Sequence, residues 1–403
     1  MSLEVRAAQP EEMRRFVWGD LVAFGSQPTP ANIERELEMP LRPEWTLCAV
    51  EDGEIASQMG VLPFRMQWNG HTIDVGGVTA VSTLPTHRRR GYLRKLMTKA
   101  LSDMRDRGQS VAILWASMAA IYQRYGYGLG FRGQRYRFDP RGLSYVEPIA
   151  TPGRIRFLPI EQAAETLGEV YTRFAGPRTL MLQREPDWWQ WQFRWPQDAV
   201  QLLAVYEEAG RIQGYVSYYL SQTEIDGPGP RQTVHVSQFV WTTPAAHRAL
   251  IQYVAGYDLA RQVEIRRVPV DDPLVFQVQE PRLYGTLLSD GLWVRLVDVE
   301  QALSQRGYDD DGRIRLGIED ELCPWNNGVW EVQANAGTGT VRRQNAEPEI
   351  RLSPRALAVL SSGCANATSL AAAGLITADD TAALPRADRL FAVSAAPLCL
   401  DGF

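Results

Sequence analysis

The chain has 403 residues and a formal net charge of −5, with 45% hydrophobic and 22% charged residues. This composition is that of a globular protein, and the length suits roughly two to four domains of about 100–200 residues each. The acidic balance argues against a general nucleic-acid binder and is compatible with a cationic substrate. No apolar run approaches the roughly 20 residues that span a bilayer, so we expect no membrane partner.

The opening residues, MSLEVRAAQPEEMRRF, contain no apolar segment typical of a secretory signal, and we therefore expect a cytoplasmic protein. The cysteines and histidines form no CxxC, HxxxH or HExxH pattern. We expect buried free thiols and no metal site. These residues are Cys48, Cys323, Cys364 and Cys399, with His71, His87, His235 and His247.

The first zone, residues 1–150, ends in the Pro- and Gly-rich stretch DPRGLSYVEPIATPG. Early in it, ANIERELEM predicts a helix with Glu34 and Glu38 on one side, which we interpret as a solvated face and only secondarily as a substrate site. TLCAV, EDGE and IASQMGVLPF then predict a hairpin. Residues 75–84 predict a buried strand, and residues 92–104 have the apolar spacing of an amphipathic helix.

The turn PTHRRRG joins this strand to this helix. The first turn of a helix presents free N–H groups and a partial positive charge, which suit a pyrophosphate. Gly91 allows close backbone approach, and Arg88, Arg89 and Arg90 add bidentate donors for phosphate oxygens. A solvated basic turn is the alternative. Neither GxxxxGK[ST] nor GxGxxG occurs in this turn.

The second zone, residues 151–287, repeats the pattern of the first. LLAVY, EEAG and RIQGYVSYYL predict a hairpin, and TVHVSQFVWTTPAAHRALIQYVA predicts a strand and a helix. His247-Arg248 stands where His87-Arg88 stands in the first zone, but the glycine and two arginines are missing. We interpret this zone as a copy that no longer binds a cofactor; chance similarity is the alternative.

The Trp-rich segment PDWWQWQFRW lies within the second zone. We interpret it as core or interface packing, with an aromatic cage for a cation as the alternative. Its tryptophans are Trp188, Trp189, Trp191 and Trp195.

The third zone, residues 288–403, contains short strands and helices such as LWVRLVDVEQAL, GRIRLGI and RALAVLSSG. Its last residues, LFAVSAAPLCLDGF, are largely apolar. Chain ends are usually polar and frayed, so this segment predicts a docked terminus.

The turn resembles motif A of the GNAT N-acetyltransferases, whose pattern is Q/R-x-x-G-x-G/A. Here it reads Arg88-Arg89-Arg90-Gly91-Tyr92-Leu93, and Leu93 departs from the small residue of the pattern. The chain is also similar along its length to the enhanced intracellular survival (Eis) acetyltransferases. VSTLPTHRRRGYLRKLM, ASMAAIYQRYGYG, PDWWQWQFRW and LWVRLVDVEQALSQRGY carry this resemblance, with the terminal Phe403.

The resemblance implies an α/β (α+β) protein of two tandem GNAT domains followed by a sterol-carrier-protein-like domain. It implies acetyl-CoA as co-substrate and an amine acceptor such as an aminoglycoside, a polyamine or a lysine. It also implies a homo-hexamer built as a trimer of dimers.

The same resemblance assigns the pantetheine arm to a gap between residues 75–84 and the next strand, VAILWA. The backbones of Val81 and Thr83 would pair with that arm around Ser82, with Tyr92 opening the helix beside the phosphates. Ser117 would lie where the arm passes; an N-cap of the following helix is an equal alternative.

Acetyl transfer to an amine needs a proton acceptor and a donor for the leaving thiolate. A tyrosine is neutral at pH 7 and can donate a proton. IYQRYGYG offers Tyr122, Tyr125 and Tyr127, and the residues alone do not choose among them or exclude core packing. The Eis pattern places the general acid at Tyr122.

For the base, the resemblance points to the terminal carboxylate of Phe403, which is ionised at neutral pH. An ordinary packed C-terminal segment is the alternative. Asp401 is a candidate for holding a cationic substrate. A lipid- or small-ligand-binding protein that uses the third zone remains a second functional hypothesis, and it would need an open apolar tunnel.

Overall fold

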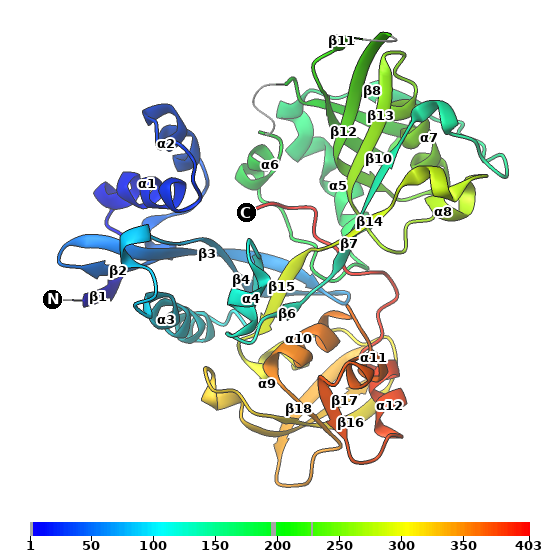
Figure 1. Ribbon diagram of the computed structural model, residues 1–403. Helices are drawn as coiled ribbons and strands as arrows, with labels where there is room; N and C mark the ends of the chain where they lie inside the picture. The colour runs from blue at the N-terminus through cyan, green and yellow to red at the C-terminus, as the bar shows by residue number, and fades with distance from the viewer. Residues whose placement is uncertain (1–2, 195–198, 227–228) are drawn as a thin grey trace. The chain divides into compact units, whose positions relative to one another are not determined.

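A computed structural model of the chain describes residues 3–194, 199–226 and 229–403 (Figure 1). Residue contacts divide the chain into two compact units. The first unit comprises Met1–Gly130, Leu292–Val393 and Phe403, and the second comprises Phe131–Gly291 and Ser394–Gly402.

Within the described residues, the first unit holds a seven-stranded sheet in the order β1-β2-β3-β4-β5-β15-β6. Neighbouring strands are antiparallel except β4 and β5, which are parallel. The strands are β1 Leu3–Arg6, β2 Thr46–Glu51, β3 Glu54–Trp68, β4 His71–Thr83, β5 Val111–Trp115, β6 Gly128–Leu129 and β15 Leu292–Leu296.

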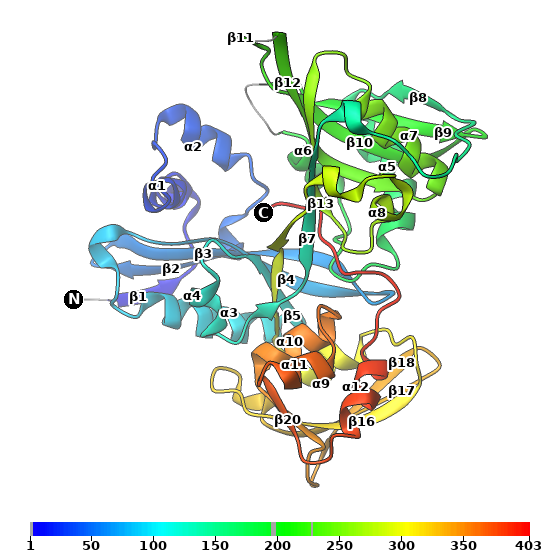
Figure 2. The same cartoon turned by 45° about the vertical axis from the view of Figure 1, so that its right-hand side comes forward.

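Helices cover both faces of this sheet, with α1 and α2 on one face and α3 on the other (Figures 1 and 2). They are α1 Met13–Ala23, α2 Pro30–Leu37, α3 Tyr92–Asp106 and the short α4 Ala119–Gln123. The apolar spacing predicted for residues 92–104 is observed, because one side of α3 is buried in the core. The buried side chains are Tyr92, Leu96, Met97, Ala100, Leu101 and Met104.

The first unit also contains a second, five-stranded sheet in the order β18-β17-β16-β19-β20 within the described residues. The buried guanidinium of Arg306 donates to the carbonyl oxygens of Ser361, Gly307 and Phe391, which ties this region together. Its strands are β16 Gly312–Ile318, β17 Gly328–Asn335, β18 Thr338–Gln344, β19 Ile350–Leu352 and β20 Ile376–Ala378, and its helices are α9 Val299–Ser304, α10 Pro354–Ser362, α11 Ala367–Ala372 and α12 Ala383–Leu390.

In the second unit the described residues form one sheet in the order β14-β7-β13-β12-β10-β9-β8, with β11 paired to β12. The strands are β7 Arg132–Phe138, β8 Arg154–Phe157, β9 Leu202–Glu208, β10 Arg211–Leu220, β11 Glu224–Asp226, β12 Gly229–Trp241, β13 Ala260–Val268 and β14 Leu287–Asp290. The helices are α5 Ala163–Ala175, α6 Pro186–Gln192, α7 Pro244–Ala255 and α8 Leu274–Gln277.

The sheets do not follow the expected divisions at residues 150 and 287. Strand β7 precedes residue 150 but pairs with β13 and β14 of the second unit. Strand β15 follows residue 287 but pairs with β5 and β6 of the first unit. Composition marks the Pro- and Gly-rich stretch at 139–153, but it carries no signal for strands that join the sheet of another segment.

The repeat predicted from the sequence is present in the structure. The hairpin β2–β3 in the first unit corresponds to β9–β10 in the second. Each hairpin pairs with a long strand, β4 or β12, that is followed by a helix, α3 or α7, and then by a parallel strand, β5 or β13.

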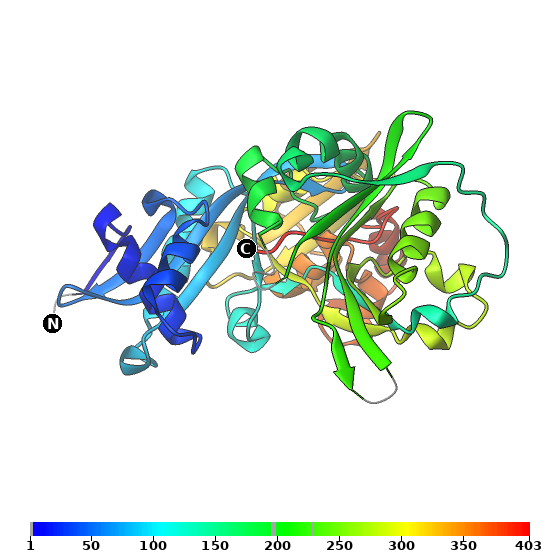
Figure 3. The ribbon, with the colours of Figure 1, turned by 90° about the horizontal axis from the view of Figure 1, so that it is seen from above.

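The C-terminal segment of the second unit, residues 394–402, is fastened by buried polar contacts, and Figure 3 shows it in red beside the green strands of that unit. The carboxylate of Asp401 accepts from Arg184 Nε at 2.7 Å, Trp188 Nε1 at 2.9 Å and the Tyr171 hydroxyl at 3.1 Å. The Arg184 and Asp401 side chains are both 0% exposed. Gln192 forms two hydrogen bonds with the backbone of Gly402.

The ion pair predicts a large stability loss for Asp401→Ala, because the variant leaves the buried Arg184 charge without its counter-ion. Removal of one partner of a buried pair costs about 3–5 kcal/mol. The loss in the free energy of unfolding is measured by urea unfolding, followed by tryptophan fluorescence. Asp187→Asn changes an exposed carboxylate of the same helix and serves as the matched control. Equal unfolding midpoints for the two variants would contradict the anchoring role.

Candidate active site

Strands β4 and β5 part after three paired positions. Their parallel register runs from Val75↔Val111 through Gly77↔Ile113 and goes no further. Beyond Gly77, β4 continues along β3 to Thr83, while β5 continues along β15. The backbone of Val81, Ser82 and Thr83 therefore follows β3 without a partner in β5, as the pantetheine assignment requires.

A break in β4 lies in this stretch. The register with β3 shifts between Gln58 and Gly60, and Ala80 has a φ of 48°. A β-bulge of this kind bends the strand and strengthens its twist. The bulge accounts for the departure of β4 from the direction of β5.

The turn after β4 ends at an uncapped helix. A short 3-10 turn, Pro85–His87, is followed by Arg89 with a φ of 65° and Gly91 with a φ of 80°. No side chain caps the first turn of α3, and no described heavy atom lies within 4 Å of a Cβ built on Gly91. The N–H groups that begin α3 thus keep the capacity to bind an anion.

The second unit differs at the corresponding position. The Thr243 hydroxyl accepts from the N–H of Ala246 and caps α7. His247 is buried against Asp272, and Arg248 is buried with a hydrogen bond to the carbonyl of Glu147. The basic side chains His247 and Arg248 and the N–H of Ala246 thus already have partners within the protein. This arrangement fits the interpretation of a copy without a cofactor site.

Glu51 organises the arginine turn. It accepts from Arg90 Nη1 at 2.7 Å and from the Tyr92 hydroxyl at 2.6 Å, and His87 Nε2 lies 3.3 Å away. Arg90 and Tyr92 therefore hold the turn in shape. Arg89 is exposed and makes no ion pair with any described residue, and Arg88 makes one long bond of 3.4 Å to the carbonyl of Ala23.

Sequence reasoning missed Glu51, because EDGE reads as an ordinary hairpin turn. Ser117 is exposed and lies two residues after the end of β5. It is not an N-cap: the N-cap of α4 is Met118, and no side chain caps that helix. The N-cap alternative is therefore wrong, and Ser117 remains open to a ligand.

The three tyrosines have different surroundings. Tyr127 is fully buried, and its hydroxyl lies 3.7 Å from the sulfur of Met97. Tyr125 lines a surface pocket with Arg124. Burial and, to a smaller extent, the charge of Asp20 raise the pKa of Tyr122 to about 12. Tyr122 is thus a protonated hydroxyl close to a carboxylate.

Asp20 is a second residue that sequence reasoning missed. It lies on α1, and burial raises its pKa to about 6, with a hydrogen bond from Ser82 lowering it and the charge of Glu36 raising it. It lines a cavity of about 90 Å³ together with residues of α2 and β4. Glu34 and Glu38 are not in the lining; Glu34 is exposed and pairs with Arg14.

The side chain of Phe403 packs within the first unit. Its ring centroid is 5.1 Å from that of Phe64, and a Cβ built on Gly77 would come within 3.4 Å of its ring. Gly77 is the last residue of β4 that pairs with β5. The neighbouring Asp401 is buried and neutralised by Arg184, so its charge is used inside the fold.

The described tryptophans of α6, Trp188, Trp189 and Trp191, are buried, as the packing interpretation expects. Trp189 stacks on Phe193 and meets Tyr171 edge to face. Trp195 lies outside the described residues.

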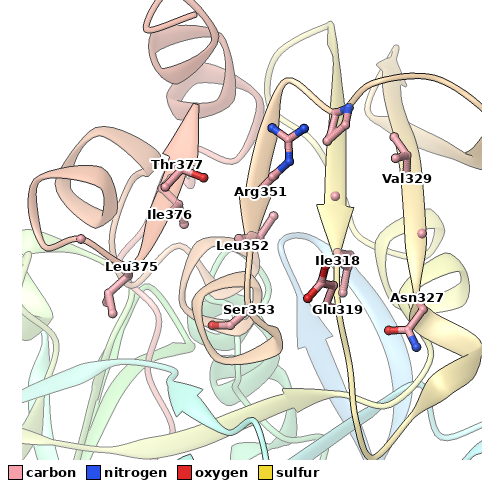
Figure 4. A pocket seen from close by; sticks show the side chains of 14 residues that line it. Ile318, Glu319, Asn327, Val329, Arg351, Leu352, Ser353, Leu375, Ile376 and Thr377 are labelled. Atoms are coloured by element: carbon pink, nitrogen blue, oxygen red, sulfur yellow. The ribbon is translucent and has the colours of Figure 1, made fainter. Parts of the chain in front are cut away.

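A pocket of about 590 Å³ lies on the five-stranded sheet (Figure 4). Its lining mixes the apolar Ile318 and Val329 with the polar Glu319, Asn327 and Arg351. This lining differs from the apolar tunnel that a lipid-binding function requires.

The residues that the structure describes contain no cluster of three or more His, Cys, Asp or Glu side chains able to hold a metal ion. They also contain no helix with the length and apolarity needed to span a bilayer.

Comparison with known proteins matches the chain to three domain families. Residues 4–130 and 180–296 match models of the acetyltransferase (GNAT) domain, and residues 299–400 match the sterol carrier protein domain. An uncharacterised N-acetyltransferase of Streptomyces coelicolor is 32% identical over 100% of both chains. The N-acetyltransferase Eis of Mycobacterium tuberculosis is 26% identical, covering 84% of this chain and 83% of its own.

The crystal structure of an Eis protein from Mycobacterium abscessus superposes with a TM-score of 0.86 at 30% identity, covering 99% of this chain and 100% of that one. The predicted fold class is confirmed by these matches. The chain belongs to the Eis-like N-acetyltransferases of the GNAT superfamily, with two GNAT domains followed by a sterol carrier protein domain.

Proposed function

We propose that this enzyme transfers the acetyl group of acetyl-CoA to a primary amine of a cationic acceptor, such as an aminoglycoside, a polyamine or a lysine. The observation that carries the proposal is the parting of β4 from β5 beside the uncapped start of α3. GNAT acetyltransferases use acetyl-CoA, and the two features together suit its two parts: an extended arm and a pyrophosphate.

The first unit supplies donors for both parts. The free backbone of Val81 and Thr83 suits the amides of the pantetheine arm, with Ser117 near its path. The N–H groups at Gly91 and the exposed Arg88 and Arg89 suit the phosphates.

Replacement of both Arg88 and Arg89 by glutamine is expected to weaken acetyl-CoA binding by about 10-fold to 100-fold, because charge-assisted bonds to phosphate are lost. Calorimetric titration with acetyl-CoA measures the change. Arg107→Gln, at the other end of α3, removes an exposed charge without touching the site. Equal affinities of the two variants would move the phosphate site elsewhere.

We propose Tyr122 as the acid for the departing thiolate. The amine nitrogen attacks the acetyl carbonyl, the carbon–sulfur bond breaks, and Tyr122 delivers its proton to sulfur. Its raised pKa, about 12, keeps the hydroxyl protonated throughout the working range of pH. The side chain of Tyr127 is enclosed, which leaves Tyr125 as the competitor.

Tyr122→Phe is expected to lower kcat by about 10²-fold or more, since general acid catalysis contributes about 10²–10⁴-fold. The dissociation constant of acetyl-CoA should not change. Tyr125→Phe is the matched control on the same segment. Similar losses of kcat in both variants, measured by thiol release, would refute the assignment.

We propose the C-terminal carboxylate of Phe403 as the base that takes the proton of the attacking amine, directly or through water. Two facts support this: the ring of Phe403 packs on Phe64, and it lies beside Gly77, where β4 leaves β5.

A short peptide tag added after Phe403 is therefore expected to reduce turnover by about 10²-fold or more, because it removes the carboxylate from its place. Acetyl-CoA binding should survive. The same tag at the N-terminus is the control. Full turnover of the C-terminally tagged enzyme, measured by thiol release at saturating acetyl-CoA, would exclude this base.

We also propose a homo-hexamer arranged as a trimer of dimers. Large apolar side chains exposed on the second unit favour self-association, because their burial in an interface would remove apolar surface from water. They include Val146, Phe276, Leu283, Leu287 and Leu288.

A further inference from the structure

The cavity beside α1 has an apolar wall and an acidic end. It lies between α1, α2 and β4, all within the first unit. Its polar groups are the carboxylates of Asp20 and Glu36 and the hydroxyl of Thr79. The other lining residues are Met13, Phe16, Val17, Leu37, Met39, Leu41 and Ala80.

Asp20 is incompletely satisfied inside this cavity. Its Oδ1 atom is buried and has no hydrogen-bond partner among the described residues. Ser82 gives the carboxylate one hydrogen bond, and the ion pairs found among the described residues include none to Asp20. The neighbouring Glu36 pairs through one oxygen with Arg35 at 3.4 Å. A buried carboxylate without a full set of partners is costly, so the site is suited to a cationic ligand.

The surroundings of Asp20 make its charge available at neutral pH. The titratable groups whose charges reach it are Glu36 of α2 and Tyr122 of α4, and β4 contributes only the hydroxyl of Ser82. Its pKa, raised to about 6 by burial, leaves the group ionised above that pH.

The cavity adjoins the acetyl-transfer site. Ser82 lies in the stretch of β4 that follows the bulge at Ala80, and Ala80 itself lines the cavity. The charge of Asp20 also raises the pKa of Tyr122. A ligand in the cavity therefore lies beside the stretch of β4 that is assigned to the pantetheine arm.

We propose that Asp20, assisted by Glu36, binds a second ammonium group of the acceptor, so that the preferred substrates are aliphatic diamines or polyamines. One amine would react while the other is held in the cavity. The proposal rests on the function proposed above. The size agrees with it, because a cavity of about 90 Å³ suits an unbranched aminoalkyl end.

The test varies one charge on the substrate and one on the protein. 1,4-Diaminobutane and butylamine have the same carbon chain but differ by the second ammonium. For the unmodified enzyme, kcat/KM is expected to be about 10-fold to 100-fold higher for the diamine, as expected for a bond to a charged group. In Asp20→Asn this ratio should fall close to one.

Glu34→Gln is the matched control, since this carboxylate lies on α2 outside the cavity. The proposal would be overturned if Asp20→Asn kept the same ratio of kcat/KM between 1,4-diaminobutane and butylamine as the unmodified enzyme. Equal losses for both amines would also overturn it, because Asp20 would then act on the reacting amine. If neither amine is acetylated, calorimetric binding of 1,4-diaminobutane to both proteins still tests the cavity separately from the proposed reaction.

Two pH-dependent readouts separate binding from folding. Protonation of Asp20 should raise the KM for the diamine below about pH 6, and Asp20→Asn should lack this rise.

The pKa of Asp20 is higher in the folded protein than in the unfolded chain, so ionisation of Asp20 destabilises the fold as pH rises through 6. Asp20→Asn should therefore melt at a higher temperature than the unmodified enzyme at pH 8, and this gain should vanish at pH 4. A lower melting temperature at pH 8 would show that the carboxylate is satisfied within the fold.

Discussion

The divergence of β4 from β5 is the constraint on which the rest of the first unit depends. Two consecutive glycines make it possible at the centre of β4. A Cβ on Gly76 would lie 2.3 Å from the sulfur of Met104, and one on Gly77 would lie 2.4 Å from the ring of Phe64. Helix α3 and Phe64 thus pack directly on the strand backbone just before the strands part. Side chains here would overpack the core, at a cost of about 1–3 kcal/mol.

Three carboxylates in this protein show how surroundings decide the role of one chemical group. Glu51 is satisfied by Arg90 and Tyr92 and fixes a turn. Asp401 is satisfied by Arg184 and fixes the C-terminal segment. Asp20 keeps a buried oxygen that has no partner among the described residues, and this is the basis of the cation site proposed above. The same chemical group thus has different partners at three places in the fold.

The sequence contained strong signals for local structure. The apolar periodicity of α3, the position of Gly91 and the repeated strand–helix pattern predicted real elements, because each depends on residues close together in the chain. It contained no signal for β15 in the first sheet or β7 in the second, since strand pairing depends on distant segments. Asp20 was missed for the same reason: its role follows from Ser82, Glu36 and Tyr122, which come from three other elements.

The two copies of the strand–helix unit differ in how the helix begins. Thr243 closes the N-terminus of α7, while α3 begins at a glycine with no side chain to close it. Of these two corresponding helices, only α3 begins without a side-chain cap. The cofactor site proposed above therefore implies one donor molecule for each chain, and the catalytic capacity of an assembly would scale with its number of chains and not with its number of acetyltransferase domains.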